Sequence, residues 1–367
     1  MKKTIFVKLY SDIFYFFLSS LLIMGLIVWT LQAVNYFDFV TEDGHGLSVY
    51  FSYSLLNFPK IINRIIPFIF LVSTFYIILM YEFKNELSIF WVNGISKIEF
   101  LNKLLIFSIL LMLFQIFLSS YLSPLTQYKA RGFLKNSNID FFTSLIKKGK
   151  FINVAKNITI FIEKENKDGS FSNIFLEDMR EQNQKMIYAK KGYLINDGVK
   201  KKFRLSDGRV VNKEKTNLSI FEFDEIDFNL NNLDSNTIVK PKIQEVNIKI
   251  LINCLKTSID QSITSFNCEE GIKPEIKREL FKRIYKPLYI PLLALINIFL
   301  IINSKYNANH KKYNFVIFLS SILILIFSEA STRYFATSDY LSILSMIIPV
   351  FLFISLYLIF LKITKNV

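Results

Sequence analysis

The sequence predicts an α-helical membrane protein with six transmembrane helices and one inserted, exported all-β domain of jellyroll-like type. Three observations support this fold class. Hydrophobic residues make up 52% of the 367-residue chain, they gather in six long runs, and charged residues concentrate between the third and fourth runs. About 20 apolar residues in a helix cross the ~30 Å hydrocarbon core of a bilayer. We therefore expect three spans, an inserted domain and three further spans.

The six apolar runs are the candidate spans. The first has no charged residue; it resembles a signal peptide, but its length and the lack of a small-residue cleavage site predict an uncleaved span. The second carries Arg64 and Pro67 near one end and the fourth opens with Lys286 and Pro287, so their bounds are set less sharply. The runs lie near residues 13–34, 61–81, 104–122, 287–303, 315–331 and 341–361.

Lysines in the short loops predict the orientation, because loops rich in Lys and Arg stay in the cytoplasm. One set of loops and ends holds Lys2, Lys3, Lys8, Lys84, Lys97, Lys103, Lys305, Lys311, Lys312, Lys362 and Lys365. The opposite short loops hold little beyond Lys60. Both termini are therefore expected in the cytoplasm and residues 125–283 outside it.

The segment 125–283 has the pattern of an all-β domain. Asp-Gly pairs within residues 167–170, 196–199 and 206–209 are typical of tight hairpin turns. Short stretches with strand character lie between them, such as NITIFIEK at 157–164. Five to eight strands indicate a sandwich, barrel or jelly roll. The pattern leaves two interiors open, a closed apolar core, which is the default, and an open trough.

Cys254 and Cys268 also fall in the exported segment. Cysteines outside the cytoplasm can form a disulfide, two buried thiols are the alternative, and the sequence leaves the choice open. The only histidines are His45 and His310, and no Cys/His spacing suits a metal.

No catalytic or cofactor motif is present. The sequence lacks a Walker A motif, HExxH, a nucleophile elbow and a kinase signature. The net charge of +14 comes with charges of mixed sign in the middle domain, without a basic helix interleaved with aromatics, so nucleic-acid binding is not expected. If the protein moves a substrate across the membrane, another subunit must hydrolyse the ATP.

Residues 81–100, YEFKNELSIFWVNGISKIEF, form an amphipathic interruption between two apolar runs. Asn85 is placed to cap a short helix on which Leu87, Phe90 and Trp91 share one stripe. Asn93-Gly94 can end that helix in a left-handed conformation. The following Ser-Lys-Ile-Glu, residues 96–99, is a capping box with Ile95 and Phe100 as a hydrophobic staple. The residues alone fit either an interfacial helix or a helix that docks on a partner.

This stretch resembles the cytoplasmic signature of the LptF/LptG permease family. The match rests on Glu86-Leu87 and on Gly94-Ile95-Ser96, followed in order by Pro124 with Lys129 and Arg131, IYAKKGYL at 187–194, and Glu279-Leu280 with Arg283. The layout of three spans, an exported β-jellyroll and three spans is also similar. SNIFLED at 172–178 and Ser-Thr-Arg at 331–333 look more like the LptF-type member.

The resemblance implies a permease subunit of an ABC transporter in a bacterial inner membrane, without catalytic residues of its own. Its expected partners are a cytoplasmic ABC ATPase dimer, a paralogous six-helix permease subunit, a periplasmic bridge protein and lipopolysaccharide. The implied domains are spans one to three (1–124) with a coupling helix near 85–95, a periplasmic β-jellyroll with a helical return segment (125–283), and spans four to six (284–367).

The resemblance also implies two sets of functional residues. Glu86, Leu87, Phe90, Trp91 and Gly94 would couple the permease to the ATPase. Arg333, Arg64 and Lys60 would contact the lipid headgroup from the outer face, because lipopolysaccharide carries phosphates. For Arg333 an ion pair with Glu329, one helical turn away, is the structural alternative.

Three other functions fit part of the pattern. The permease of another lipid or lipoprotein-releasing ABC exporter also combines spans with an exported domain, but usually has four spans. A membrane sensor would place an exported β domain between helices, but it would need a cytoplasmic output domain. A membrane-embedded enzyme would need polar catalytic residues within the spans, where Glu329 is the main candidate.

Overall fold

The computed structural model divides the chain into two compact units. The helical unit comprises residues 1–32, 56–128 and 242–367, and the β unit comprises residues 33–55 and 129–241. The structure describes residues 2–37, 46–133, 149–155, 158–166, 169–179, 184–196, 201–214, 217–229, 241–256, 268, 270–303 and 305–365.

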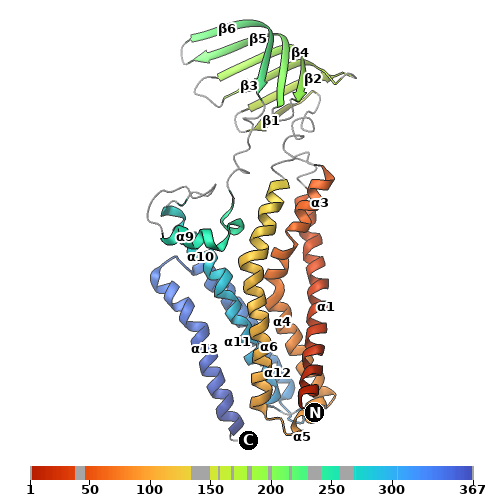
Figure 1. Cartoon of the computed structure of the whole chain (residues 1–367), viewed down its shortest axis with the longest axis vertical. Helices are drawn as coiled ribbons and strands as arrows, with labels where there is room; N and C mark the ends of the chain where they lie inside the picture. Colours follow the sequence, from red (N-terminus) through yellow and green to blue (C-terminus); the bar gives the residue numbers. More distant parts are fainter. Residues whose placement is uncertain are drawn as a thin grey trace. The chain divides into compact units, whose positions relative to one another are not determined.

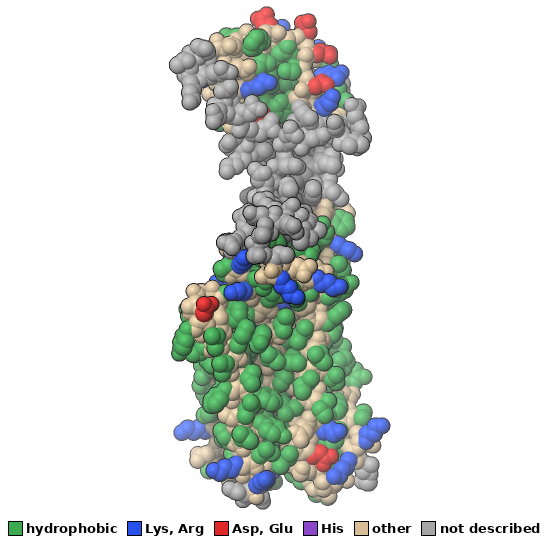
Figure 2. All heavy atoms as spheres, turned by 60° about the vertical axis from the view of Figure 1, so that its left-hand side comes forward, with side chains coloured by type: hydrophobic (Ala, Val, Ile, Leu, Met, Phe, Trp, Pro, Cys, Tyr) green, Lys and Arg blue, Asp and Glu red, His purple; other side chains and the backbone are tan. Residues whose placement is uncertain are grey.

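Within the described part of the chain, six helical stretches are long and apolar enough to cross a membrane, which confirms the expected number of spans; Figure 1 shows the long helices. They cover residues 2–36, 47–83, 97–133, 273–301, 310–334 and 339–365. The long helices are α1 (Lys2–Tyr36), α4 (Phe58–Phe83), α6 (Lys97–Phe117), α12 (His310–Tyr334) and α13 (Asp339–Lys365). A short helix, α3 (Leu47–Leu56), precedes α4, and a π-helical turn, η1 (Leu118–Leu122), follows α6. Figure 2 shows a broad band of hydrophobic side chains on the helical unit with basic side chains at both of its ends.

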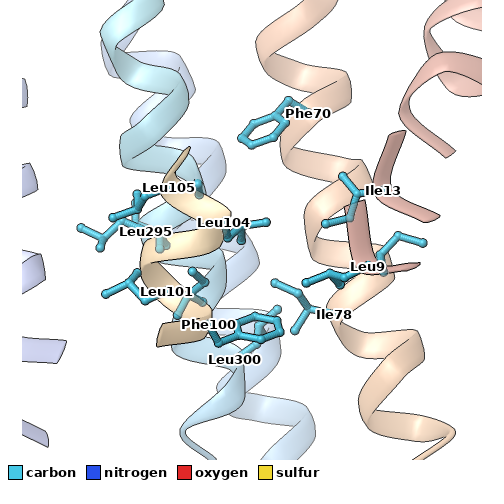
Figure 3. Close-up of a cluster of buried hydrophobic side chains, with 14 of the residues drawn as sticks. Leu9, Ile13, Phe70, Ile78, Phe100, Leu101, Leu104, Leu105, Leu295 and Leu300 are labelled. Carbon is cyan, nitrogen blue, oxygen red and sulfur yellow. The ribbon is translucent and has the colours of Figure 1, made fainter. Parts of the chain in front are cut away.

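The fourth span lies at the centre of the helical unit. It consists of α10 (Lys273–Ile284), the 3₁₀ turn η5 (Lys286–Leu288), α11 (Tyr289–Ile298) and the 3₁₀ turn η6 (Phe299–Ile301). Every residue of α11 is buried, and α11 packs against α4, α6, α12 and α13. A helix that is apolar on all sides and covered on all sides is a core element. Figure 3 shows side chains of α1, α4, α6 and the α11–η6 segment meeting in one cluster.

One polar side chain ties three spans together inside this core. The Asn297 amide donates to the Thr74 hydroxyl at 2.6 Å and to the Leu71 carbonyl at 3.1 Å, and it accepts from the Ser321 hydroxyl at 3.2 Å. Within a membrane such hydrogen bonds between helices help to fix their packing.

A return segment precedes the fourth span. It contains the 3₁₀ turn η3 (Ile243–Glu245), α9 (Ile248–Lys256) and the 3₁₀ turn η4 (Glu270–Ile272). Cys254 and Cys268 form a disulfide with a Cα–Cα distance of 5.6 Å, which answers the question that the sequence left open.

The described residues of the β unit form a six-stranded antiparallel sheet, which confirms an inserted all-β domain. The strands follow one another as a meander in the order β1 to β6. They are β1 (Phe151–Ala155), β2 (Ile158–Glu165), β3 (Phe171–Asp178), β4 (Gln184–Asn196), β5 (Lys201–Glu214) and β6 (Asn217–Asn229). One face carries a closed cluster of buried apolar residues, with Ile160, Leu176, Phe203 and Leu205 at its centre. Among the described residues the interior is therefore a closed core.

One expected hairpin turn is instead a feature of a strand. Gly169, with φ of 77°, lies in the turn between β2 and β3 as expected. The turn at 197–200 lies outside the described residues, although β4 and β5 pair up to its edge at Asn196 and Lys201. Asp207-Gly208, however, lies inside β5, where Asp207 has φ of 54°. The expectation of a turn there was wrong, because positive φ also serves to bend a strand within a sheet.

This bend runs across several strands and is called the crease here. On each of five neighbouring strands, β2 to β6, one residue has no partner in the strand pairing. These residues are Glu163, Asn173, Lys190, Asp207 and Asp224. Gly208 permits the bend, since a Cβ there would lie 2.2 Å from the Tyr188 carbonyl oxygen and 2.4 Å from the Phe223 ring. The crease thus depends on close backbone approach at a single glycine.

Candidate functional site

Helix α5 (Glu86–Val92) forms the elbow between the second and third spans, at the end of the helical unit that also holds both chain termini (Figure 1). Gly94 has φ of 71°, as the sequence predicts for the left-handed residue that ends the helix. The Ser96 hydroxyl then accepts from the Glu99 amide at 3.1 Å and begins α6. Asn85 departs from the prediction: its side chain does not cap α5, and its Oδ1 accepts from Lys305 Nζ instead.

The inward face of α5 is anchored in the core of the same chain. Phe90 is 2% exposed and packs its ring against Phe6, Phe100 and Tyr81, with ring-centroid distances of 5.7, 5.2 and 6.3 Å. Leu87 is buried in the same cluster. Trp91 is only half-buried, with its ring 6.0 Å from that of Phe100. α5 is therefore joined to α1, α4 and α6 rather than free at the surface.

Charged contacts reinforce this attachment. The Lys2 ammonium donates to the Gly94 carbonyl at 2.8 Å and lies 3.5 Å from the Glu99 carboxylate. The Lys8 ammonium lies 3.5 Å from the Glu86 carboxylate. At the opposite side of the elbow, His310 Nε2 lies 3.4 Å from Glu82 Oε2. Both the N-terminal helix and the start of α12 thus hold the elbow in place.

The outward face of the elbow is apolar and open. Val92 is 86% exposed, and Phe83 and Ile89 are also exposed. Among the predicted coupling residues, Gly94 is exposed and Glu86 is partly exposed. Phe83, Ile89 and Val92 were not predicted from the sequence, because both faces of this short helix are apolar and the stripe through Phe90 is the more aromatic one. The sequence feature that could have predicted them is that they are apolar although they lie outside the stripe of Leu87, Phe90 and Trp91.

A second group of candidate residues gathers at the end of the helical unit opposite α5. Lys60 is half-buried and Arg64 is exposed, both near the start of α4. The positive charges of Lys282, Arg64 and Lys242 and the negative charge of Glu245 all act on Lys60. We call Lys60, Arg64, Lys242, Lys282 and Lys286 the basic cluster. Two of its members were predicted. Lys242 lies just before the return segment, and Lys282 and Lys286 lie in the first half of the fourth span; sequence alone did not show that these three come close to α4.

Glu329 joins this cluster through Lys286 rather than through its own helix. Its carboxylate forms an ion pair with the Lys286 ammonium and lies within the fields of Arg64 and Lys282. The expected alternative pair with Arg333 is therefore not the contact that Glu329 makes. Arg333 itself is exposed at the end of α12.

Arg283, which the sequence resemblance included, is buried beside the basic cluster. Its guanidinium donates to the carbonyls of Val246 at 2.9 Å, Gln244 at 2.9 Å and Ile243 at 3.3 Å, and to the Glu279 carboxylate at 3.0 Å. It therefore fixes the return segment to α10 and does not face a ligand.

These features define a class. In the part of the chain that the structure describes, six apolar helices and an inserted antiparallel sheet make the chain a multi-pass membrane protein, and no group of three His, Cys, Asp or Glu side chains could hold a metal.

The chain belongs to the lipopolysaccharide export system permease family LptF/LptG, whose model matches residues 9–363. Membership makes it a transporter subunit rather than an enzyme. The chain is also 26% identical over 241 residues to the uncharacterized protein RP871 of Rickettsia prowazekii (strain Madrid E), covering 65% of this chain and 67% of that protein.

Proposed function

We propose that this protein is a permease subunit of an ABC transporter that extracts lipopolysaccharide from the inner membrane and passes it to a periplasmic bridge toward the outer membrane. The family match over residues 9–363 is the observation that carries the proposal. The substrate supplies the physical reason for a motor: each buried CH₂ group holds a lipid in the bilayer by about 0.8 kcal/mol, so a multi-chain lipid does not leave unaided.

The elbow is the proposed contact with a cytoplasmic ATPase dimer. Phe83, Ile89 and Val92 offer the apolar surface, while Glu86, Trp91 and Gly94 border it. Leu87 and Phe90, which the resemblance also implied, have the role of anchors, since they face the core. A push on the outward face would pass through Phe90 into α1, α4 and α6 together, because the Phe90 ring packs on residues of all three.

The basic cluster and Arg333 are the proposed headgroup contacts. Phosphate groups bind best to several convergent cations. Lys60 and Arg64 contribute two, and Lys282 and Lys286 lie close enough to act on the same groups. The closed apolar interior of the β unit would receive acyl chains only if the sheet opens, since its core residues are almost fully covered.

The second permease subunit is proposed from the exposed apolar helices. In the most apolar 18-residue stretch of each helix, only 22% of the residues of α1 and 17% of those of α13 are buried within this chain. Such helices must face lipid or another protein within the membrane. A paralogous six-helix subunit packed on them would enclose a cavity between the two subunits.

Co-purification from native membranes tests the motor contact. Val92→Asp and Ile89→Asp should each release the ATPase, because a carboxylate would have to be buried in an apolar interface. Lys97→Asp serves as a control for added charge on α6 beyond the elbow. If the ATPase stays bound to both variants, the elbow is not its docking site.

A second experiment tests the substrate. Depletion of the protein should cause lipopolysaccharide to accumulate in the inner membrane, and crosslinking of lipopolysaccharide should fall when Arg64 and Arg333 are changed to Glu. Accumulation of another lipid or of lipoproteins would instead identify an exporter of that substrate. Unchanged crosslinking would remove Arg64 and Arg333 from the binding site.

A further inference from the structure

A row of aromatic side chains crosses the outer face of the sheet, on the side away from the buried apolar core. Phe151 pairs with Phe161, Phe161 with Phe175, and Phe175 with Tyr188 in the strand register. The ring centroids lie 4.8 Å apart for Phe151–Phe161 and 4.9 Å for Phe175–Tyr188, close to the spacing of neighbouring strands. The row continues onto β5, where the Arg209 guanidinium lies 5.4 Å from the centre of the Tyr188 ring.

The crease turns this row into a groove of about 960 Å³. One side is the aromatic row with Arg209 and, on β6, Glu222. The other side follows the crease, where the polar residues Asn173, Lys190, Asp207 and Asp224 line the groove next to Ile174, Ala189, Gly208 and Phe223. Asn173, Lys190, Asp207 and Asp224 have no partner in the strand pairing, and Asp207 has positive φ, so the strands bend there. The bend brings these polar residues into the same groove as the aromatic row.

The chemistry of this lining selects a class of ligand. An acyl chain would remove water from five charged side chains without replacing their hydrogen bonds. A phosphate would meet three carboxylates against only two cations, Lys190 and Arg209. A sugar suits both sides: its C–H face packs on aromatic rings, and its hydroxyls both donate to carboxylates and accept from Lys, Arg and Asn.

We propose that this groove binds the saccharide part of lipopolysaccharide while the lipid is handled elsewhere in the chain. The assignment of the sugar to lipopolysaccharide rests on the proposed function, whereas the carbohydrate class rests on the groove. Exposure supports a ligand: Tyr188 is 39% exposed and Phe151 is 67% exposed, although aromatic side chains gain from being covered.

Calorimetric titration of the full-length protein in detergent with the lipid-free core oligosaccharide of lipopolysaccharide tests the proposal. We expect saturable binding that becomes about threefold to tenfold weaker in Tyr188→Ala and in Phe175→Ala, since each removes one stacking ring. Tyr188→Phe should retain binding. The matched control is Tyr193→Ala, because Tyr193 lies on the same strand with 38% exposure but outside the groove.

Several outcomes would overturn the proposal. The first is that the unaltered protein does not bind the core oligosaccharide. The second is that Tyr188→Ala binds it as tightly as the unaltered protein does, with an unchanged unfolding temperature. The third is that dextran binds as tightly as the core oligosaccharide. Loss of a partner protein or second copy from Tyr188→Ala, without oligosaccharide binding, would make the groove a protein interface. Failure of the transporter function would be seen separately, as intact lipopolysaccharide that stays in the inner membrane whether or not the oligosaccharide binds.

Discussion

Arg283 shows how one buried charge can organise a junction. Its side chain is 2% exposed, yet three backbone carbonyls and the Glu279 carboxylate accept hydrogen bonds from it. Removal of one partner from such a set leaves the others buried without hydrogen bonds, which costs more than the contacts themselves contribute. The residue therefore matters for the attachment of the return segment, independent of any ligand.

We expect Arg283→Ala to lower the free energy of unfolding by about 3–5 kcal/mol, measured by thermal or chemical unfolding in detergent. The neighbouring Lys282 is the control, because its side chain is 38% exposed and its ion pair with Glu279 spans 3.8 Å. Lys282→Ala should change the stability by no more than about 1 kcal/mol. Equal effects of the two variants would contradict the role of Arg283 in attaching the return segment to α10.

At the scale of the element, the stability of α5 depends on the residue that ends it, Gly94, as well as on its buried apolar stripe. Gly94 has positive φ, and a Cβ added there would meet nothing within 4 Å. Any effect of Gly94→Ala is therefore a backbone effect, with a cost of about 1–2 kcal/mol for the left-handed conformation. We expect lower thermal stability and weaker retention of the ATPase. Gly132→Ala is the control, since its Cβ also meets nothing but its φ is not positive; a loss of similar size there would refute the argument.

In the sheet, the corresponding element is the crease. Gly208→Ala would place a Cβ against the Tyr188 carbonyl and the Phe223 ring, and this overpacking should cost about 1–3 kcal/mol. The measured result should be faster proteolysis of the β unit and loss of oligosaccharide binding at the groove. Ser206→Ala, two residues away on β5, should leave both unchanged. A normal β unit in Gly208→Ala would show that the bend does not need close approach at this position.

At the scale of the whole molecule, the proposed function requires the elbow and the sheet to lie on opposite sides of the membrane. Single cysteines introduced as Val92→Cys and Arg209→Cys, in a background with Cys254 and Cys268 replaced by Ser, provide the measurement. In intact cells an impermeant thiol reagent should label position 209 once the outer membrane is opened, and position 92 only after lysis. Labelling of both positions from the same side would rule out the transport mechanism.

The sequence by itself determined the spans, the strands and the elbow, because each leaves a local signal. Twenty apolar residues predict a membrane helix, alternation predicts a strand, and Asn93-Gly94 followed by Ser96 predicts a turn between two helices. These signals depend on neighbours in the chain. The family resemblance also followed from short local motifs.

Only the tertiary structure decided which residues meet. Phe90 faces Phe6 and Phe100 rather than the outside, Glu329 pairs with Lys286 rather than Arg333, and Asp207-Gly208 bends a strand rather than forming a turn. A helix that is apolar on every side does not show in its sequence which side is covered. An ionic side chain likewise has several possible partners until the packing of the spans brings one of them close.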